Sequence, residues 1–347
     1  MNDDGPTTVA VVLAGGVGSR LYPASRADRP KQFLPIGGEQ SLLARTVERA
    51  DFADETVVVT RPEFADEVDD HAPQADVLIE PDGKDTGPAL TYATHRIREV
   101  YGTSDDDSLV ILALPSDHYV GDDGAFRESM TAGATVAAET DRLVTFGVTP
   151  ERPDTGYGYV EPGVARSADG AEFREVVRFH EKPDAETART YVDAGYRWNS
   201  GMFAWTPGRF LEAAADSPLA PLVDALAAGD PDGGFEAVDP VSVDYAVLER
   251  AENVAVVDAA FAWDDLGSWD ALDRVLEPDD DGNVALGDHV TVDAADNVIA
   301  SDDKHVSLVG VSGLAVVAYD DRVLVVPKAE AQRVRDLVSL LAAEESF

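Results

Sequence analysis

The sequence predicts an α/β protein with a Rossmann-like sheet of parallel or mixed strands, followed by a small β-rich domain and a terminal helix. Two observations predict the sheet. Short apolar runs rich in β-branched residues, such as 9–13 and 109–114, are typical of strands buried on both faces. Segments with helical periodicity alternate with these runs, which is the pattern of a sheet whose ligands bind at the carboxyl ends of its strands.

Composition narrows the class of protein. The 347 residues suffice for one large and one smaller domain, and the 44% of hydrophobic residues suffice for a core. Cysteine is absent, which excludes disulfides and thiolate chemistry. The sequence shows neither an apolar run of roughly eighteen residues nor a charged-then-apolar leader after Met1, which favours a cytoplasmic location.

The net charge of −40 makes nucleic acid a very poor partner, because phosphate backbones bind to cationic faces. The acidic residues are spread along the whole chain, as in proteins of salt-accumulating cells. We therefore expect a halophilic source.

The glycine-rich turn after the first apolar run organises the prediction of function. Gly15, Gly16 and Gly18 allow close backbone approach to a ligand, and Arg20 and Lys31 supply cationic donors beyond the turn. The spacing fits neither the dinucleotide fingerprint nor the Walker A loop. The turn is suited to a polyphosphate.

A carboxylate stands at the end of the strand predicted over 109–114, in Pro115-Ser116-Asp117-His118. A carboxylate at the tip of a buried strand is costly unless it binds something, and Mg²⁺ is a natural ligand. An acidic pair, Asp264-Asp265, follows a later short strand, and its two side chains point to opposite sides of an extended chain. His118 is more typical of a supporting hydrogen-bonder than of a catalyst.

Seven motifs occur in the order GGxGxRL, PKQFLPI, PSDH, GYGYVE, EKP, WNSG and WxDxGS, and cover nearly the whole chain. In these motifs the chain resembles the sugar nucleotidyltransferase family, and within it the mannose-1-phosphate guanylyltransferases. The resemblance implies transfer of GMP from GTP to α-D-mannose 1-phosphate with Mg²⁺ as cofactor. The spacing of the C-terminal strands suggests a small left-handed β-helix or a compact all-β cap, as guanylyltransferases of this type carry, and its edge strands and hydrophobic faces suit homodimer contacts.

The resemblance also implies roles for individual residues. Asp117 and Asp265 would hold the metal, and Arg20, Lys31 and Lys182 would complete the catalytic set. The nucleotide would bind to Leu13, Ala14, Gly15, Gly16, Gly18, Ser19, Arg20, Lys84, Asp85, Thr86, Pro115 and Asp117. The sugar phosphate would bind to Gly156, Tyr157, Gly158, Glu161, Glu181, Lys182, Asn199 and Gly201.

The chain departs from the family pattern at Lys84-Asp85, where Arg-Asn is usual. Lysine keeps the charge of arginine without its forked donors, and aspartate lacks the amide donor of asparagine.

The remaining elements follow from periodicity. Besides 9–13 and 109–114 we predict strands over 56–60, 76–79, 143–148, 173–179, 254–257 and 261–263, with helices over 41–48, 63–71, 89–100, 126–140, 184–194, 210–227 and 243–249. We expect a loop over 229–234. A break near 278–283 divides a domain over 1–278 from one over 283–347, which has short strands over 290–292, 297–300, 306–309, 314–319 and 323–326 and a helix over 329–343.

Two alternatives stay open. Another hexose 1-phosphate nucleotidyltransferase, acting on glucose 1-phosphate with UTP or dTTP, shares the first loop, the Lys-Pro turn and the second aspartate. A regulatory paralogue that binds GDP-mannose without catalysis is a different class, and retention of both metal carboxylates argues against it.

We predict that the protein needs high salt to stay folded. At about 1 M salt the Debye length is only about 3 Å, so repulsion among the acidic side chains is largely screened. Thermal or urea unfolding in dilute buffer and in molar KCl measures this dependence. Full stability in dilute buffer would contradict it.

Overall fold

The computed structural model describes residues 5–102 and 109–343. The chain forms two compact units, each built from three segments. The first unit contains Met1–Gly15, Thr46–Pro115 and Asp122–Phe261, and the second contains Gly16–Arg45, Ser116–Gly121 and Ala262–Phe347. These units follow a different division from the linear one predicted near 278–283, because 16–45 and 116–121 join the C-terminal residues. The linear division into sequence modules stays a prediction.

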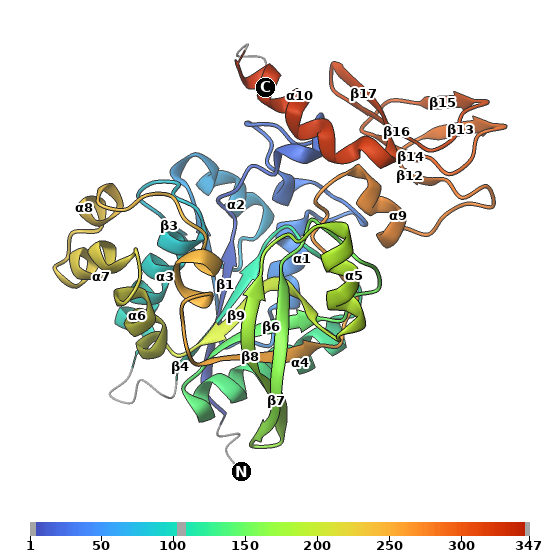
Figure 1. Ribbon diagram of the computed structural model, residues 1–347. Helices are drawn as coiled ribbons and strands as arrows, with labels where there is room; N and C mark the ends of the chain where they lie inside the picture. Colours follow the sequence, from blue (N-terminus) through green and yellow to red (C-terminus); the bar gives the residue numbers. More distant parts are fainter. Residues whose placement is uncertain (1–4, 103–108, 344–347) are drawn as a thin grey trace. The chain divides into compact units, whose positions relative to one another are not determined.

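The first unit is built on a nine-stranded sheet in the order β3-β2-β1-β4-β9-β6-β10-β8-β7 (Figure 1). The neighbours β3, β2, β1 and β4 run parallel, whereas β9 is antiparallel to both β4 and β6. The predicted mixed α/β sheet is therefore confirmed. The strands are β1 (Thr7–Leu13), β2 (Glu55–Thr60), β3 (Asp76–Ile79), β4 (Leu109–Pro115), β6 (Leu143–Val148), β7 (Tyr159–Ala168), β8 (Ala171–His180), β9 (Arg197–Trp205) and β10 (Val254–Ala259).

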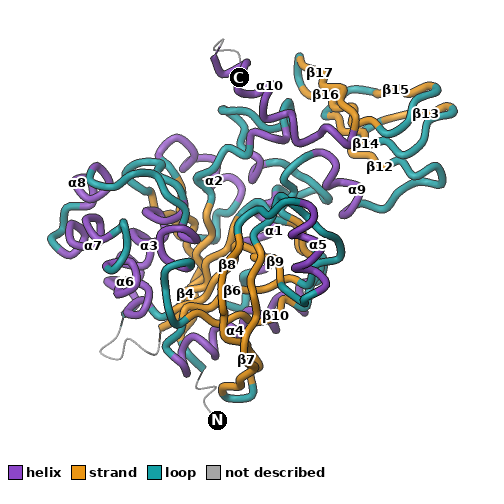
Figure 2. The backbone as a smooth tube through the Cα atoms, viewed as in Figure 1, coloured by secondary structure: helices purple, strands orange, loops and turns teal. Residues whose placement is uncertain are grey.

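Helices and short helical turns accompany the strands of this sheet (Figure 2). Val9 and Val11 of β1 face a core that includes Leu90 and Phe210, while Ala10 and Val12 are buried on the other face. The helices of the unit are η3 (Pro62–Phe64), α2 (Ala65–His71), α3 (Thr86–Tyr101), α4 (Asp123–Thr140), α5 (Ala185–Asp193), α6 (Pro207–Ala215), α7 (Ala220–Ala227), α8 (Pro231–Glu236) and the π-helix η5 (Asp244–Leu248). Helix α1 (Leu42–Arg49) carries the chain from the second unit into the first.

Three sequence predictions in this unit were wrong in detail. The loop expected over 229–234 contains α8, because the Asp230 side chain caps the helix by accepting from Gly233 N at 3.1 Å. The single helix expected over 210–227 is two helices, α6 and α7. The helix expected over 243–249 is a π-helix rather than an α-helix.

The second unit contains the β-rich C-terminal segment. The strands β12 (Val284–Leu286), β14 (Val298–Ser301), β16 (Leu314–Tyr319) and β17 (Arg322–Pro327) form one sheet, and β13 (His289–Val292) pairs in parallel with β15 (Val306–Val309). Successive parallel strands separated by turns make a β-helix-like stack, as predicted. Helix α10 (Val334–Ala343) follows the 3-10 turn η7 (Lys328–Arg333).

Two buried asparagines tie the turns of this stack together. Asn297 Nδ2 donates to Asn283 Oδ1 at 2.9 Å, and Asn297 Oδ1 accepts from Leu314 N at 3.0 Å. Asn283 Nδ2 donates to Ala294 O at 3.0 Å. Each amide thus satisfies backbone groups that the turns would otherwise leave buried and unpaired.

The β-rich segment shares its core with the other two segments of the unit. Tyr22 and Leu34 pack in one cluster with Trp269, Val317 and Val334, and Trp269 Nε1 donates to Tyr22 O at 2.9 Å. The short elements of these segments are η1 (Ser19–Leu21), η2 (Lys31–Phe33), β5 (Tyr119–Val120), β11 (Trp263–Asp264), η6 (Trp269–Ala271) and α9 (Leu272–Val275).

No helix in the described ranges 5–102 and 109–343 is both long enough and apolar enough to cross a membrane.

Candidate active site

The glycine-rich turn begins at the end of β1 in the first unit. Ala14 N donates to Val59 O at 2.8 Å, and Thr60 Oγ1 donates to Ala14 O at 3.1 Å, so the neighbouring strand fixes the start of the turn. Leu13 is the register partner of Pro115 on β4. Two residues predicted to bind the nucleotide therefore lie side by side at the carboxyl ends of parallel strands.

The rest of the turn belongs to the second unit, where it is held against Lys31. Gly18 has φ +67°, and a Cβ on it would lie 2.5 Å from Lys31 Cβ, so only glycine fits. Lys31 N donates to Val17 O at 3.1 Å, and Ser25 Oγ donates to the same carbonyl at 2.7 Å. Ser19 and Arg20 follow in η1, and both are partly exposed.

The ammonium of Lys31 joins the two aspartates predicted to bind metal. Its side chain is only 5% exposed, and Nζ donates to Asp117 Oδ2 at 2.9 Å and to the backbone carbonyl of Asp265 at 2.5 Å. A buried ammonium requires such partners. Lys31, Asp117 and Asp265 come from three separate segments of the second unit, and the fold brings all three together.

Asp117 is held as a carboxylate. Burial would raise its pKa, but the charge of Lys31 and the hydrogen bond from its ammonium outweigh burial and lower the pKa below its ordinary value. His118 lies beside it, with Nε2 3.9 Å from Asp117 Oδ1. Burial lowers the pKa of His118, so this imidazole is neutral.

Hydrogen bonding fixes the tautomer of His118. Trp263 Nε1 donates to His118 Nδ1 at 3.1 Å, so Nδ1 accepts and the ring proton is on Nε2, facing Asp117. This supports the predicted role of His118 as a supporting residue.

The two adjacent aspartates at the end of β11 have different partners. Asp264 is buried, pairs with Arg274 Nε at 2.6 Å and accepts from Leu266 N at 2.8 Å. Asp265 is less buried, and its Oδ1 accepts from Gly267 N at 3.0 Å. Asp264 therefore stabilises the turn, and Asp265 is the better candidate for a metal ligand.

The donor set suits Mg²⁺. Mg²⁺ usually takes one or two protein carboxylates and completes its shell with waters and substrate phosphate oxygens. Asp117 is ionised and accepts from the Lys31 ammonium through Oδ2. Asp265 accepts from the same ammonium through its backbone carbonyl. In the part of the chain that the structure describes, no group of three or more His, Asp or Glu side chains is placed to hold a metal ion.

The segment predicted to approach the base lies in the first unit. Asp85 caps α3 by accepting from Thr86 N at 2.7 Å, with φ at +71°, which is uncommon for a residue other than glycine. Lys84 Nζ donates to Val238 O at 3.0 Å. The lysine that replaces the usual arginine is thus bound to backbone.

The residues predicted to bind the sugar gather around Gly158, also in the first unit. A Cβ on Gly158 would lie 2.8 Å from Glu181 Oε2 and 3.7 Å from Asn199 Cβ. Asn199 N donates to Gly158 O at 2.9 Å. A larger residue here would push the Glu181 carboxylate aside, and the structure brings these three predicted residues together.

Backbone strain marks the same cluster. Lys182 has φ +40°, and its ammonium pairs with Glu181 while staying largely exposed. Gly201 has φ +71°, a conformation that favours glycine. Left-handed backbone at a lysine costs of the order of 1 kcal/mol and is concentrated at functional sites.

Other predicted sugar residues have structural partners. Gly156 N donates to Asp154 Oδ1 at 2.8 Å, and the Tyr157 ring packs edge-on against Trp198 with centroids 5.0 Å apart. Glu161 lies 3.4 Å from His180 Nε2, the residue before Glu181.

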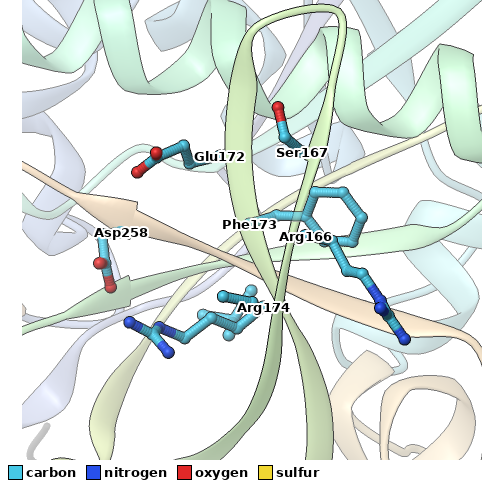
Figure 3. A pocket seen from close by; sticks show the side chains of 8 residues that line it. Arg166, Ser167, Glu172, Phe173, Arg174 and Asp258 are labelled. Carbon is cyan, nitrogen blue, oxygen red and sulfur yellow. The ribbon is translucent and has the colours of Figure 1, made fainter.

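A pocket on the β7–β8 hairpin contains none of the predicted site residues (Figure 3). Its arginines do not converge, because Arg166 and Arg174 extend to opposite sides of the hairpin (Figure 3). Arg166 pairs with Glu175, and Asp258 pairs with Arg197. We give this pocket no part in the chemistry.

Sequence reasoning missed Glu80, which follows β3. Its side chain is buried, its Oε1 packs against Gly15, and its Oε2 has no hydrogen-bond partner among the described residues. Burial raises the pKa of Glu80 from 4.5 to about 7 despite the charge of Arg61 nearby. The signal was an acidic residue directly after β3, which pairs with β2, the neighbour of the strand that leads into the glycine-rich turn.

Comparison with known proteins identifies the class. A nucleotidyl transferase family model matches residues 9–281, and a MannoseP isomerase/GMP-like beta-helix domain model matches residues 287–341. The first match covers most of the chain, which therefore belongs to the nucleotidyl transferases.

Relatives narrow the class further. The xanthan biosynthesis protein XanB of Xanthomonas campestris is 37% identical, over 95% of this chain and 72% of its own length. The mannose-1-phosphate guanylyltransferase of Escherichia coli K12 is 36% identical, over 96% and 73%. A Thermus thermophilus crystal structure, described as mannose-1-phosphate geranyltransferase, matches with a TM-score of 0.88 and 38% identity, over 97% of this chain and 99% of that one. The chain belongs to the mannose-1-phosphate guanylyltransferase family.

Glu80→Gln should make stability less dependent on pH. The folded chain keeps this proton up to about pH 7, whereas the unfolded chain releases it near 4.5, so wild-type stability falls as pH rises between these values. Relative to the variant, the wild type should lose about 3 kcal/mol across this window. Urea unfolding at constant high salt measures the difference, with Asp82→Asn on the exposed part of the same loop as control. A difference between wild type and Glu80→Gln that stays constant with pH would contradict the assignment.

Proposed function

We propose that this enzyme transfers GMP from GTP to α-D-mannose 1-phosphate, forming GDP-mannose and releasing pyrophosphate. The observation that carries the proposal is the buried ammonium of Lys31, which binds the Asp117 carboxylate and the Asp265 carbonyl beside a glycine turn. The names of relatives at 35–36% identity supply the sugar and the nucleotide.

The reaction needs no nucleophilic side chain. An oxygen of the sugar phosphate attacks the α-phosphorus of GTP in line, a new phosphorus–oxygen bond forms, and the bond to the β-phosphate oxygen breaks. The protein contributes positioning and charge stabilisation. In this proposal Arg20 and Lys31 neutralise triphosphate oxygens, while Lys182, placed by its strained turn, binds the attacking phosphate.

Asp117 and Asp265 would hold Mg²⁺, whose charge would offset that of the phosphate oxygens when bound. The low pKa of Asp117 keeps this ligand ionised, and the neutral His118 adds no competing positive charge. Glu181 and Asn199 would bind sugar hydroxyls.

The deciding experiment is a pyrophosphate-release assay in molar KCl. The panel combines GTP, ATP, UTP and dTTP with mannose 1-phosphate, glucose 1-phosphate and galactose 1-phosphate. GTP with mannose 1-phosphate should give the highest kcat/KM. A preference for UTP or dTTP with glucose 1-phosphate would replace the proposed substrates, and no turnover with any pair would indicate a binding protein.

Lys31→Met should lower kcat more than it changes nucleotide affinity, because the ammonium acts on charge that develops during transfer. The expected loss in kcat is roughly 100-fold. Lys304→Met, where the lysine pairs with Asp302 and Asp303 on the β-rich segment, is the matched control and should keep normal turnover.

Asp117→Asn should remove activity together with its dependence on Mg²⁺. Turnover measured across a Mg²⁺ titration tests this, with isothermal titration of Mg²⁺ as an independent readout. Near-normal turnover in this variant, or a wild type that works fully in excess chelator, would refute the metal assignment.

We also infer a homodimer that uses the β-rich segment. Val290 and Val292 of β13 and Val309 of β15 are 47%, 52% and 69% exposed and stand on one face of the paired strands. Such a face suits a second copy of the chain. Light scattering in molar KCl should give twice the mass of one chain, and Val309→Asp should halve that value; a wild-type mass of one chain would refute the dimer.

A further inference from the structure

The orientation of the Asn199 amide is fixed by three partners from three different segments. Its Nδ2 donates to Asp244 Oδ1 at 2.6 Å, and its Oδ1 accepts from Thr145 Oγ1 at 3.1 Å and from Gly201 N at 3.2 Å. A carboxylate only accepts and a backbone N–H only donates, so the amide cannot be turned around.

The hydrogen bonds of the Asn199 amide leave one of its donors available to a ligand. An asparagine amide has two acceptor lone pairs and two N–H donors. Thr145 and Gly201 use both lone pairs, and Asp244 uses one N–H. Among the described residues, the second N–H of Asn199 has no partner. Asn199 therefore offers a ligand one donor and no acceptor.

Glu181 supplies the opposite chemistry in the same cluster. Its carboxylate can only accept, and a Cβ on Gly158 would lie 2.8 Å from Glu181 Oε2 and 3.7 Å from Asn199 Cβ, so both residues border Gly158. A sugar hydroxyl can do both things at once: it can donate to Glu181 while it accepts from Asn199. This arrangement works only if the amide keeps its present orientation.

Asp244 is an unusual group to find in this position. It begins the π-helix η5, and π-helical turns are rare and frequent at functional sites. Burial raises the pKa of Asp244, with the carboxylates of Glu181 and Asp85 adding to the rise. Within the described part of the chain it forms no ion pair with a lysine or arginine. A buried acid without a cation costs stability, so a purely structural role would be better served by a neutral residue.

The residues before Asp244 connect it to the segment predicted to bind the nucleotide. Val241 N donates to Lys84 O at 3.2 Å, and Gly87 N donates to Val241 O at 3.0 Å. Val243 N donates to Thr86 Oγ1 at 2.9 Å. Residues 241–244 thus bind the segment 84–87 through their backbone groups, and they bind Asn199 through the Asp244 side chain.

We propose that Asp244 is a positioning residue for sugar recognition. It holds the Asn199 amide in one orientation, in which the remaining N–H of Asn199 donates to a hydroxyl of the hexose 1-phosphate. The same hydroxyl donates to the Glu181 carboxylate. The inference rests on the proposed function, since it concerns the sugar of that reaction. Asp244 lies outside the seven sequence motifs, in the segment predicted only as a helix over 243–249.

A double-mutant cycle with Asp244→Ala and Asn199→Ala tests the proposal. Asp244→Ala should raise KM for mannose 1-phosphate roughly tenfold and leave KM for GTP nearly unchanged, the loss expected for one hydrogen bond to a charged group. Asp244→Asn should stay within about threefold of wild type, because its amide carbonyl still accepts from Asn199. The double variant should be no worse than Asn199→Ala alone.

Asp239→Ala, which removes an exposed acid nearby in the sequence, is the matched control and should behave as wild type. Thermal unfolding in the assay salt checks that each variant is folded, and Asp244→Ser takes the place of Asp244→Ala in the cycle if the latter is unfolded.

Two results would overturn the proposal. One is independence, in which the losses of the two single variants multiply in the double variant. The other is an Asp244→Asn variant as impaired as Asp244→Ala, which would show that charge rather than the acceptor matters. The wild-type substrate panel separates these failures from failure of the proposed function, because the cycle uses whichever hexose 1-phosphate the wild type turns over.

Discussion

The buried ammonium of Lys31 is the constraint on which the glycine-rich turn and the segments carrying Asp117 and Asp265 depend. An ammonium that is 5% exposed is stable only with partners, and it finds one carboxylate and one carbonyl on segments more than eighty residues away in sequence. The same side chain excludes any residue but glycine at position 18. One lysine thus fixes the shape of the glycine turn, the ionisation of Asp117 and the position of the chain at Asp265.

Around Gly158, the residues predicted to bind the sugar depend on glycines that leave space and on hydrogen bonds that match each donor with an acceptor. Gly158 leaves room for the Glu181 carboxylate, and Gly201 adopts a backbone conformation that favours glycine. Polar groups that use nearly all of their hydrogen-bond donors and acceptors form a rigid cluster, because no side chain can rotate without leaving a partner unsatisfied. Under the proposed function, such a cluster would distinguish hydroxyl arrangements by hydrogen-bond direction rather than by size.

The sequence was most informative where chemistry and strand periodicity coincide. The apolar runs predicted β1 and β4 almost to the residue, and the motifs led to Lys31, Asp117 and Asp265, which the fold brings together. Helix ends were harder, since the α8 helix depends on one capping side chain, Asp230. The Asn199–Asp244 bond was invisible because forty-five positions separate the partners and no periodicity links them. The buried Glu80 likewise depends on which strands become neighbours.

The second unit gathers its residues from three stretches of the chain, and this has a consequence for how the molecule can be dissected. Tyr22, Trp269 and Val334 share one core, so a fragment ending near residue 280 would lose the side chains that pack behind the loops carrying Lys31 and Asp265. The C-terminal stack therefore shares a core with the segments that carry Lys31 and Asp265 and is not a separable domain. An evolutionary exchange of this tail would have to preserve the apolar side chains that it contributes to this shared core.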